Sequence, residues 1–305
     1  MGHSLRYEVN CSILFTELPL LQRPAAAKAA GFDAVEFWWP FATAVPGDAE
    51  VDEYVRAIDD AGVSLVGLNF FAGDMPSGDR GLVSWPARSA EFRDNVPVVA
   101  AIGERLGCKA FNALYGNRMD GPHGPAGTDR ADSTDRADST GSTDSTDSPS
   151  ADEQDDLAAE NLTFAARGVA GIGGTVLLEP ISGARYPLRT AADVAAVIAR
   201  VSAGDGPDNI GLLADLYHLA VNGDDVDKAI AAHTGTPGGI AHVQIADAPG
   251  RNEPGTGDLP LDRQLSDLQS AGYTGWVGLE YTPSDPTDSA ASFSWLPLAR
   301  RGAAV

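Results

Sequence analysis

Four polar side chains end four apolar segments in the second half of the chain: Glu179, Asp215, Gln244 and Glu280. Three of them are carboxylates, and carboxylates held close together raise one another's pKa. A hard divalent cation relieves that repulsion, and an all-oxygen ligand set suits Mg²⁺ or Mn²⁺. Paired carboxylates also serve general acid–base chemistry, in which a proton leaves one atom and returns to another. These residues predict a metal-assisted proton-transfer site, provided that the fold brings them together.

Two histidines lie close to these acids in the sequence. His218 follows Asp215 by three residues, and His242 precedes Gln244 by two, so His242 and Gln244 face the same side of a strand. Taken alone, each histidine is as well explained by core packing, and a single strand-end acid by a helix cap. The repetition of the pattern at four consecutive strand ends favours a functional site.

A loop rich in Gly and Pro, residues 248–258, holds Arg251 and Glu253. Such a loop can place a guanidinium over an active site, where it would pair bidentately with a substrate carboxylate. An ordinary turn-rich connector is the alternative interpretation.

The site requires a fold that gathers distant strand ends, and the chain alternates strand and helix signals. Glycines follow several helical segments, as at Gly62 and Gly107, where a left-handed residue lets the chain turn into the next strand. The pattern predicts a single (β/α)₈ TIM barrel over 1–305, in which the C-terminal strand ends share one mouth. A doubly wound open sheet is the alternative, but no strand is followed by a G-x-G-x-x-G turn.

The expected elements alternate along the chain. The strands are Tyr7–Cys11, Ala34–Phe37, Leu65–Asn69, Ala110–Leu114, Val176–Glu179, Ile210–Asp215, Ala241–Ile245 and Val277–Tyr281. The helices are Leu21–Ala30, Val51–Ala61, Ala87–Leu106, Leu157–Val169, Ala191–Val201, Val226–Ala232 and Leu261–Ala271.

The segment 120–156 interrupts this pattern. It repeats Asp-Ser-Thr, duplicates Asp-Arg-Ala-Asp-Ser-Thr and contains almost no apolar residues. Because such a segment buries too little surface to offset its ordering entropy, we expect a disordered acidic insertion in a surface loop rather than a domain boundary.

The composition limits the partners. With 43 acidic against 21 basic side chains, the net charge of −22 argues against nucleic acid, which requires a basic face. A small anionic substrate is permitted, because a metal and local arginines reverse the potential inside one pocket. Cys11 and Cys108 lack the spacing of a disulfide framework or zinc site. No signal-peptide or membrane-spanning run is present, which predicts a cytoplasmic protein without a membrane partner and leaves homo-oligomer formation open.

Four stretches of the chain form a recognisable set: HVQIADAPGRNEPGTGD at 242–258, GYTGWVGLEY at 272–281, DLYH at 215–218 and NFFAGD at 69–74. Together they resemble the hydroxypyruvate isomerase family, which belongs to the xylose isomerase-like TIM barrels. The resemblance extends over nearly the whole chain outside the acidic segment, and the first two stretches are the specific ones.

That resemblance implies an isomerase that interconverts hydroxypyruvate and tartronate semialdehyde through an enediolate. Glu179 and Glu280 would be the paired proton donor and acceptor. The divalent metal, Mg²⁺ or Mn²⁺, would be held at the positions of Glu179, Asp215, Gln244 and Glu280. The substrate-binding candidates are His218, Arg251, Glu253 and His242.

Two residues depart from the family pattern and leave the substrate open: Asn252 stands where His is frequent, and Asp258 where Glu is frequent. The alternatives are a 2-oxo-tetronate isomerase acting on a four-carbon acid, an epimerase or dehydratase of the same superfamily, and a catalytically silent barrel that binds a sugar acid. Arg251 favours an acid over a neutral sugar. An endonuclease of related fold would need more histidine ligands than five histidines offer, and a basic face.

Overall fold

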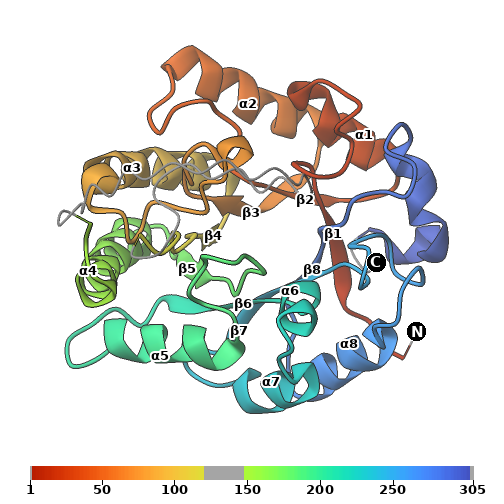
Figure 1. The fold of residues 1–305 in the computed structure, drawn as a ribbon. Helices are drawn as coiled ribbons and strands as arrows, with labels where there is room; N and C mark the ends of the chain where they lie inside the picture. The colour runs from red at the N-terminus through yellow and green to blue at the C-terminus, as the bar shows by residue number, and fades with distance from the viewer. Residues whose placement is uncertain (1, 120–147, 303–305) are drawn as a thin grey trace, which may run out of the picture.

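The computed structural model describes residues 2–119 and 148–302. Its eight parallel strands close into a barrel in sequence order, and β1 pairs with β8 (Figure 1). The closed barrel confirms the predicted TIM-barrel fold. The strands are β1 (Arg6–Asn10), β2 (Ala34–Phe37), β3 (Ser64–Asn69), β4 (Ala110–Asn112), β5 (Thr175–Leu178), β6 (Ile210–Asp215), β7 (Ile240–Ile245) and β8 (Trp276–Leu279).

Helices surround the barrel (Figure 1). They are α1 (Arg23–Ala29), α2 (Asp48–Ala61), α3 (Ser89–Leu106), α4 (Ala151–Ala170), α5 (Ala191–Val201), α6 (Leu216–Val221), α7 (Val226–His233) and α8 (Leu261–Ser270). Short 3₁₀ helices are η1 (Leu20–Gln22), η2 (Met75–Ser77), η3 (Pro86–Arg88), η4 (Ser289–Trp295) and η5 (Leu298–Arg300). The sequence pattern predicted all of the longer helices but missed α6, a short helix that begins directly after β6.

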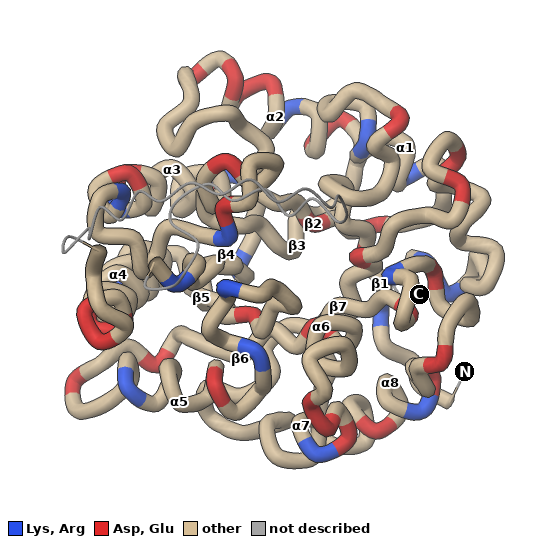
Figure 2. The backbone as a smooth tube through the Cα atoms, viewed as in Figure 1, with Lys and Arg blue, Asp and Glu red and all other residues tan. Residues whose placement is uncertain are grey.

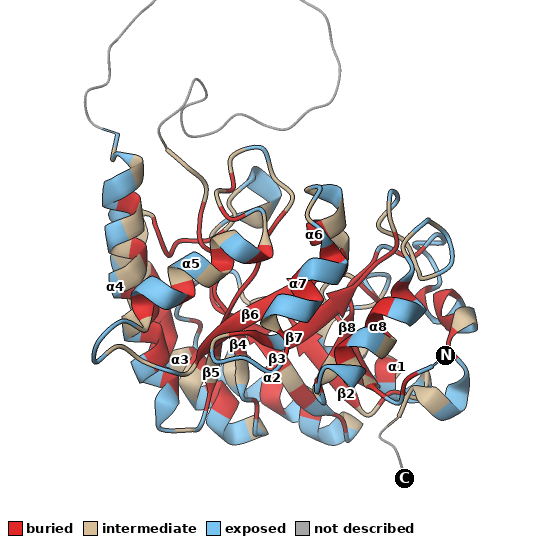
Figure 3. Cartoon of the chain, turned by 90° about the horizontal axis from the view of Figure 1, so that it is seen from below, coloured by how far each residue is buried: buried red, intermediate tan, exposed pale blue. Residues whose placement is uncertain are grey.

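The hydrophobic core fills the inside of the barrel and the space between the strands and the surrounding helices. Every residue of β2 and β6 is buried, as expected for parallel strands covered on both faces. Helix α2 buries Tyr54, Val55 and Ile58 and leaves its opposite face exposed. Figure 3 shows this division, with buried residues on the strands and exposed residues on the outer helix faces.

Glycines end two helices in the way that the sequence predicts. Gly62 follows α2 with φ 64°, and Gly107 follows α3 with φ 73°. Both values are left-handed, a conformation that glycine adopts without the clash of a Cβ. Strand β3 begins at Ser64 and strand β4 at Ala110, so each turn is short and keeps strand and helix in contact.

Helix α4 begins earlier than predicted. Its first turn is stabilised by a reciprocal cap in which the backbone N–H of Glu153 donates to the Ser150 hydroxyl and the backbone N–H of Ser150 donates to the Glu153 carboxylate. Acidic side chains in this turn also favour the positive end of the helix dipole. The prediction of a disordered insertion over 120–156 is therefore wrong at its C-terminal end, because residues 151–156 are helical. The part of that prediction at 120–147 lies outside the described residues.

Charged residues lie largely on the outer elements, and acidic residues predominate along α2 (Figure 2). Within 2–119 and 148–302, no helix combines the length and the apolar character that crossing a membrane requires.

Candidate active site

A cavity of about 400 Å³ opens at the C-terminal ends of the barrel strands. Four predicted site residues line it: Glu179, His218, Arg251 and Glu280. Glu179 directly follows β5, Glu280 directly follows β8, and His218 lies in α6 after β6. Barrel closure therefore brings together side chains that are far apart in the sequence.

The acidic side chains converge on one point of this cavity. One potential ligand atom from each of Glu179, Asp215, His218 and Glu280 lies within 4.8 Å of the others, and all four residues are buried. Three of the four predicted metal ligands belong to this cluster. The close approach of three carboxylates in a buried place is unfavourable unless cations or protons offset their charges.

Glu179 is the more isolated of the two predicted proton carriers. Asn112, the last residue of β4, donates from Nδ2 to its Oε2 at 2.8 Å. Burial and the charges of Glu280 and Asp215 raise the pKa of Glu179 well above its usual value, and the Asn112 hydrogen bond opposes this only in part. Burial and the neighbouring carboxylates thus disfavour the charged form of Glu179.

Glu280 is held by several donors. Its Oε1 accepts hydrogen bonds from Asn10 Nδ2 at 2.9 Å and Trp38 Nε1 at 2.7 Å, and its Oε2 accepts one from Arg251 Nη2 at 2.7 Å. Burial raises the pKa of Glu280 to about 8, against the lowering effect of Arg251 and with a further rise from Asp215. A carboxyl with a pKa near neutrality can both accept and deliver a proton.

Asp215 ends β6 and caps α6. Its Oδ1 accepts hydrogen bonds from the backbone N–H groups of Tyr217 at 2.8 Å and His218 at 3.3 Å. Its Oδ2 is buried and has no hydrogen-bond partner among the described residues. A buried carboxylate oxygen without a partner costs free energy that a bound cation would recover.

Gln244 shows the same feature. Its Nε2 donates to Glu36 Oε1 at 2.6 Å and, more weakly, to Glu280 Oε1 at 3.4 Å. Its Oε1 is buried and unpartnered within the described part of the chain. The orphaned oxygens of Asp215 and Gln244, together with the carboxylates of Glu179 and Glu280, fit the oxygen ligand set of a hard divalent metal.

His218 has a defined proton position. Its Nδ1 accepts a hydrogen bond from the backbone N–H of Ser182 at 3.1 Å, so in a neutral ring the proton must be on Nε2. Burial lowers the pKa of His218 to about 4, so the ring is neutral near pH 7. Nε2 lies 3.7 Å from Asp215 Oδ2 and 3.9 Å from Glu179 Oε1. His218 thus presents an N–H donor, which suits a substrate oxygen better than a metal ion.

Arg251 reaches the carboxylates from the loop after β7. Its backbone is left-handed, with φ 56°, and its carbonyl accepts a hydrogen bond from Thr282 N at 2.8 Å. The guanidinium stacks on the Tyr217 ring, 5.5 Å from its centroid. Its Nη2 contacts Glu280 at 2.7 Å and lies 3.8 Å from Asp215 Oδ2. Arg251 thus lines the cavity at the barrel mouth, but its guanidinium is already paired with Glu280.

Asp247 organises the Arg251 loop, a role that the sequence pattern did not reveal. Its carboxylate accepts hydrogen bonds from the backbone N–H groups of Ala248, Gly255 and Leu259. Glu253, predicted to contact substrate, accepts a hydrogen bond from Ser284 N at 3.0 Å. Among the described residues, Glu253 does not line the cavity. Its hydrogen bond instead joins the loop after β7 to the loop after β8.

His242 lies deeper in the barrel than the cavity. Its Nε2 is 2.9 Å from Glu36 Oε2 and 3.5 Å from Glu8 Oε1. Burial alone would lower the pKa of His242, but the hydrogen bonds and charges of Glu36 and Glu8 raise it to about 10. Among the described residues it does not line the cavity, and its predicted substrate contact therefore has no support in the geometry.

Several side chains of the site were not predicted. Asn10 and Asn112 end β1 and β4, so the strand-end argument that selected the acids applies to them as well. Trp38 belongs to an aromatic run at 37–41 whose residue types are as typical of core or lid packing as of substrate contacts. Ser182, which fixes the His218 ring, had no sequence signal because a loop brings it to the histidine.

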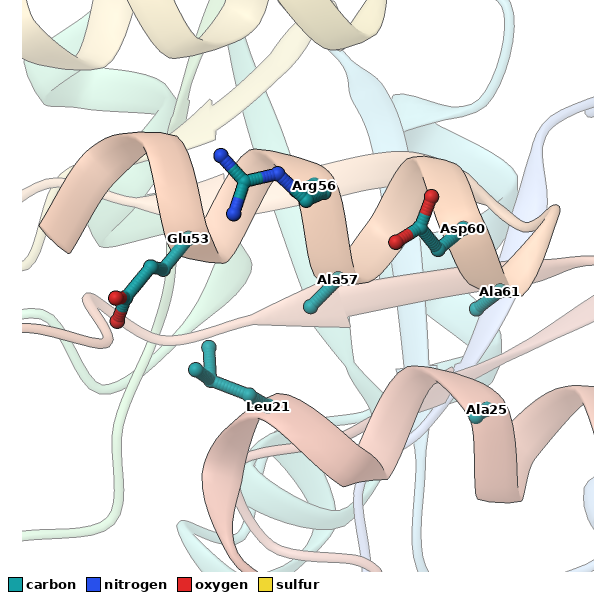
Figure 4. Close-up of a pocket in the computed structure, with 7 residues that line it drawn as sticks. All are labelled: Leu21, Ala25, Glu53, Arg56, Ala57, Asp60 and Ala61. Atoms are coloured by element: carbon teal, nitrogen blue, oxygen red, sulfur yellow. The ribbon is translucent and has the colours of Figure 1, made fainter. Parts of the chain in front are cut away.

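A second depression lies on the outside, between α1 and α2 (Figure 4). Leu21 and alanines form its floor, and Glu53, Arg56 and Asp60 border it. These charged side chains are exposed and belong to the solvent face of α2, so the depression lacks the buried polar groups of a reactive site.

The barrel fold that carries this acidic cavity at the C-terminal ends of its strands is shared with a known class of TIM barrels. A family profile described as "Xylose isomerase-like TIM barrel" matches residues 24–298. A crystal structure titled as an AP endonuclease, family 2, from Brucella melitensis superimposes with a TM-score of 0.77 at 29% identity, covering 95% of this chain and 97% of that one. The chain is a xylose isomerase-like TIM barrel.

Sequence relatives define the family more closely. A Streptomyces coelicolor protein provisionally named hydroxypyruvate isomerase is 49% identical over 98% of both chains. The Escherichia coli hydroxypyruvate isomerase is 29% identical over 96% of this chain and 98% of its own. A 2-oxo-tetronate isomerase from Cupriavidus necator is 33% identical over 95% and 97%. The chain belongs to the hydroxypyruvate isomerase family and is a sugar isomerase of that type.

Proposed function

We propose that the protein interconverts hydroxypyruvate and tartronate semialdehyde by moving a proton between two adjacent carbons. The observation that carries this proposal is the meeting of Glu179 and Glu280 in one cavity, both buried and both with a raised pKa. Two carboxyls with raised pKa values near one substrate are suited to take up and return a proton.

The reaction needs a balanced pair of proton transfers. A glutamate removes a proton from C3 of hydroxypyruvate, and the electron pair forms the C2–C3 double bond of an enediolate. A carboxylic acid then delivers a proton to C2 while the C3 oxygen becomes the aldehyde carbonyl. The hydroxyl proton passes from the C3 oxygen to the C2 oxygen, so the product has the same atoms as the substrate. The Nε2–H of His218 would stabilise one of these oxygens.

Glu179, Asp215, Gln244 and Glu280 would hold a divalent metal, Mg²⁺ or Mn²⁺. When bound, it supplies Lewis acidity that stabilises the negative charge of the enediolate. The unpartnered oxygens of Asp215 and Gln244 support this ligand set. Because Nε2 of His218 carries a proton, this nitrogen would donate a hydrogen bond to the substrate and would not ligate the metal.

A four-carbon substrate is the nearest alternative, because a 2-oxo-tetronate isomerase is among the relatives at similar identity. An epimerase or dehydratase would use the same acids on a neutral or larger sugar, and a catalytically silent barrel would only bind the acid. Arg251 lines the cavity, but because it is paired with Glu280, the choice between an acid and a neutral sugar is left to the substrate panel. Against a nuclease, each metal-capable cluster among the described residues holds a single histidine, and the net charge is −22.

A substrate panel tests the proposal. Purified protein with Mg²⁺ or Mn²⁺ is incubated with hydroxypyruvate, a four-carbon 2-oxo acid and a neutral ketose, and products are followed by NMR. We expect tartronate semialdehyde from hydroxypyruvate as the fastest conversion. Faster turnover of the four-carbon acid would transfer the assignment to that substrate, and binding without conversion would indicate a silent barrel.

A further inference from the structure

The cavity contains a second guanidinium that the proposed chemistry leaves unassigned. Arg80, in the loop after β3, lines the same cavity as Glu179, His218 and Glu280.

Arg80 differs from Arg251 in what it contacts. Arg251 is ion-paired with Glu280 at 2.7 Å. Arg80 donates only from Nη1, to the backbone carbonyls of Met75 at 3.0 Å and Asp79 at 2.7 Å. Among the described residues, no carboxylate pairs with it, and its Nε and Nη2 have no hydrogen-bond partner. The Nε–Nη2 edge of a guanidinium is a fork that matches the two oxygens of a carboxylate.

The loop around Arg80 is fixed by its own hydrogen bonds. Asp79 Oδ2 accepts from Asp74 N at 2.8 Å and from Arg88 Nη1 at 2.9 Å. Gly81 donates to the Ala72 carbonyl at 3.0 Å and adopts φ 108°. A Cβ at Gly81 would lie 1.8 Å from the Leu114 carbonyl oxygen, so only glycine permits this contact with the segment that follows β4. The guanidinium is therefore held in place before any ligand binds.

The acidic side chains around the cavity favour such a group for binding an anionic substrate. A substrate carboxylate that enters beside Glu179, Asp215 and Glu280 meets repulsion. The Arg251 charge is already offset by Glu280, whereas the Arg80 charge is not offset by a paired acid in the described residues. An anion would find its counter-charge at Arg80, on a wall formed by a different loop from that of Arg251.

We infer that Arg80 is the specificity residue that binds the substrate carboxylate, and that Arg251 instead faces the reacting end of the molecule next to Glu280. This inference rests on the proposed function and makes it more specific: the ligand is a small 2-oxo acid whose carboxylate points to the loop after β3. Arg80, rather than Arg251 as the sequence predicted, would therefore bind the substrate carboxylate.

Three variants and two compounds test the inference. Arg80→Gln keeps hydrogen-bond donors and removes the charge, Arg80→Lys restores the charge, and Arg56→Gln on the exposed face of α2 is the control. Hydroxypyruvate is compared with dihydroxyacetone, its neutral analogue, by deuterium incorporation from D₂O. Hydroxypyruvate binding to the same variants is also measured by calorimetry in proteins that carry Glu179→Gln in addition, so that turnover does not interfere.

We expect Arg80→Gln to raise the KM for hydroxypyruvate about 10- to 100-fold with kcat little changed, because a charged hydrogen bond to the substrate is lost. The preference for the acid over dihydroxyacetone should fall by a similar factor, and Arg80→Lys should recover part of it. Arg56→Gln should match the wild type.

An unchanged KM and affinity in Arg80→Gln would overturn the inference, and so would an equal loss with both compounds, which would indicate a damaged loop. A wild-type protein that does not bind hydroxypyruvate would overturn it as well. If the wild type binds hydroxypyruvate through Arg80 but incorporates no deuterium, the isomerase proposal fails and this inference stands.

Discussion

Arg251 and Glu280 form a 2.7 Å ion pair at the rim of the barrel, joining the loop after β7 to the end of β8. The pair places a fixed positive charge beside a carboxyl whose pKa burial would otherwise raise further. Arg251 reaches this position with a left-handed backbone, φ 56°, in a loop that Asp247 organises. The pair thus connects the structure of this loop to the proton affinity of Glu280.

Removal of this charge should change the pH dependence of the reaction. In Arg251→Gln, the pKa of Glu280 should rise, because the lowering effect of the guanidinium is lost. In the proposed reaction Glu280 acts as the base in one direction, so the acidic limb of the pH–rate profile should move to higher pH. We expect kcat/KM at pH 7 to fall about 10- to 100-fold. Arg251→Lys is the control, and an unmoved acidic limb would contradict the coupling.

Each glutamate should be indispensable for turnover. Glu179→Gln and Glu280→Gln remove a proton carrier without much change in shape, and we expect kcat to fall about 10²- to 10⁴-fold. Glu160→Gln, on the exposed side of α4, is a matched control that should retain full activity. Circular dichroism should show the same fold in all three. Near-normal turnover in either active-site variant would refute the assignment.

The parallel barrel makes one part of the site predictable from the sequence. In a parallel barrel, every C-terminal strand end faces one mouth, so Glu179, Asp215 and Glu280 had to converge once the fold was assigned. The sequence pattern also located every strand end to within about two residues, because buried strands and amphipathic helices differ in periodicity.

Contacts that depend on loops were not predictable. Ser182 and Arg80 reach the cavity from loops whose course is set by local hydrogen bonds, and no periodicity encodes that course. His242 shares a face with Gln244, but strand alternation does not specify depth along the barrel. The start of α4 was missed because the Ser150 cap lies in an acidic, Ser-rich segment whose composition suggested disorder.

The metal-free protein should lose stability as the pH rises. The pKa of Glu280 is about 8 in the folded state against a usual 4.5, so its contribution to stability is fully present below about 4.5 and is lost as the pH rises through 8. After EDTA treatment, the Tm should therefore fall across this interval. Glu280→Gln should flatten the decline. A Tm that rises with pH in the metal-free protein would contradict the raised pKa.

Metal addition should reverse this loss. A divalent cation that binds only the folded protein at 100 times its Kd adds about 2.7 kcal/mol to the free energy of unfolding. The gain should be larger at higher pH, where the carboxyls of the cluster are ionised. It should shrink in Asp215→Asn, which removes the carboxylate charge from the buried oxygen that accepts no hydrogen bond.

The Arg80 loop offers a test with a closely matched control. Gly81 and Gly78 both have a left-handed backbone, φ 108° and 104°, but a Cβ would clash only at Gly81. Gly78→Ala should cost about 1–2 kcal/mol of stability from its backbone conformation alone, and Gly81→Ala should cost more and raise the KM. The measurements are chemical denaturation and steady-state kinetics. Equal effects of the two changes would show that the contact with Leu114 does not position the loop.

Deuterium exchange tests the central claim most directly. The wild-type protein is incubated with hydroxypyruvate in D₂O, with and without EDTA, and the substrate and product carbons are followed by NMR. We predict deuterium at the C3 position of recovered hydroxypyruvate and at C2 of tartronate semialdehyde, strongly reduced by EDTA and by either glutamine substitution at 179 or 280. Substrate that remains fully protonated in the presence of Mg²⁺ or Mn²⁺ would contradict the account.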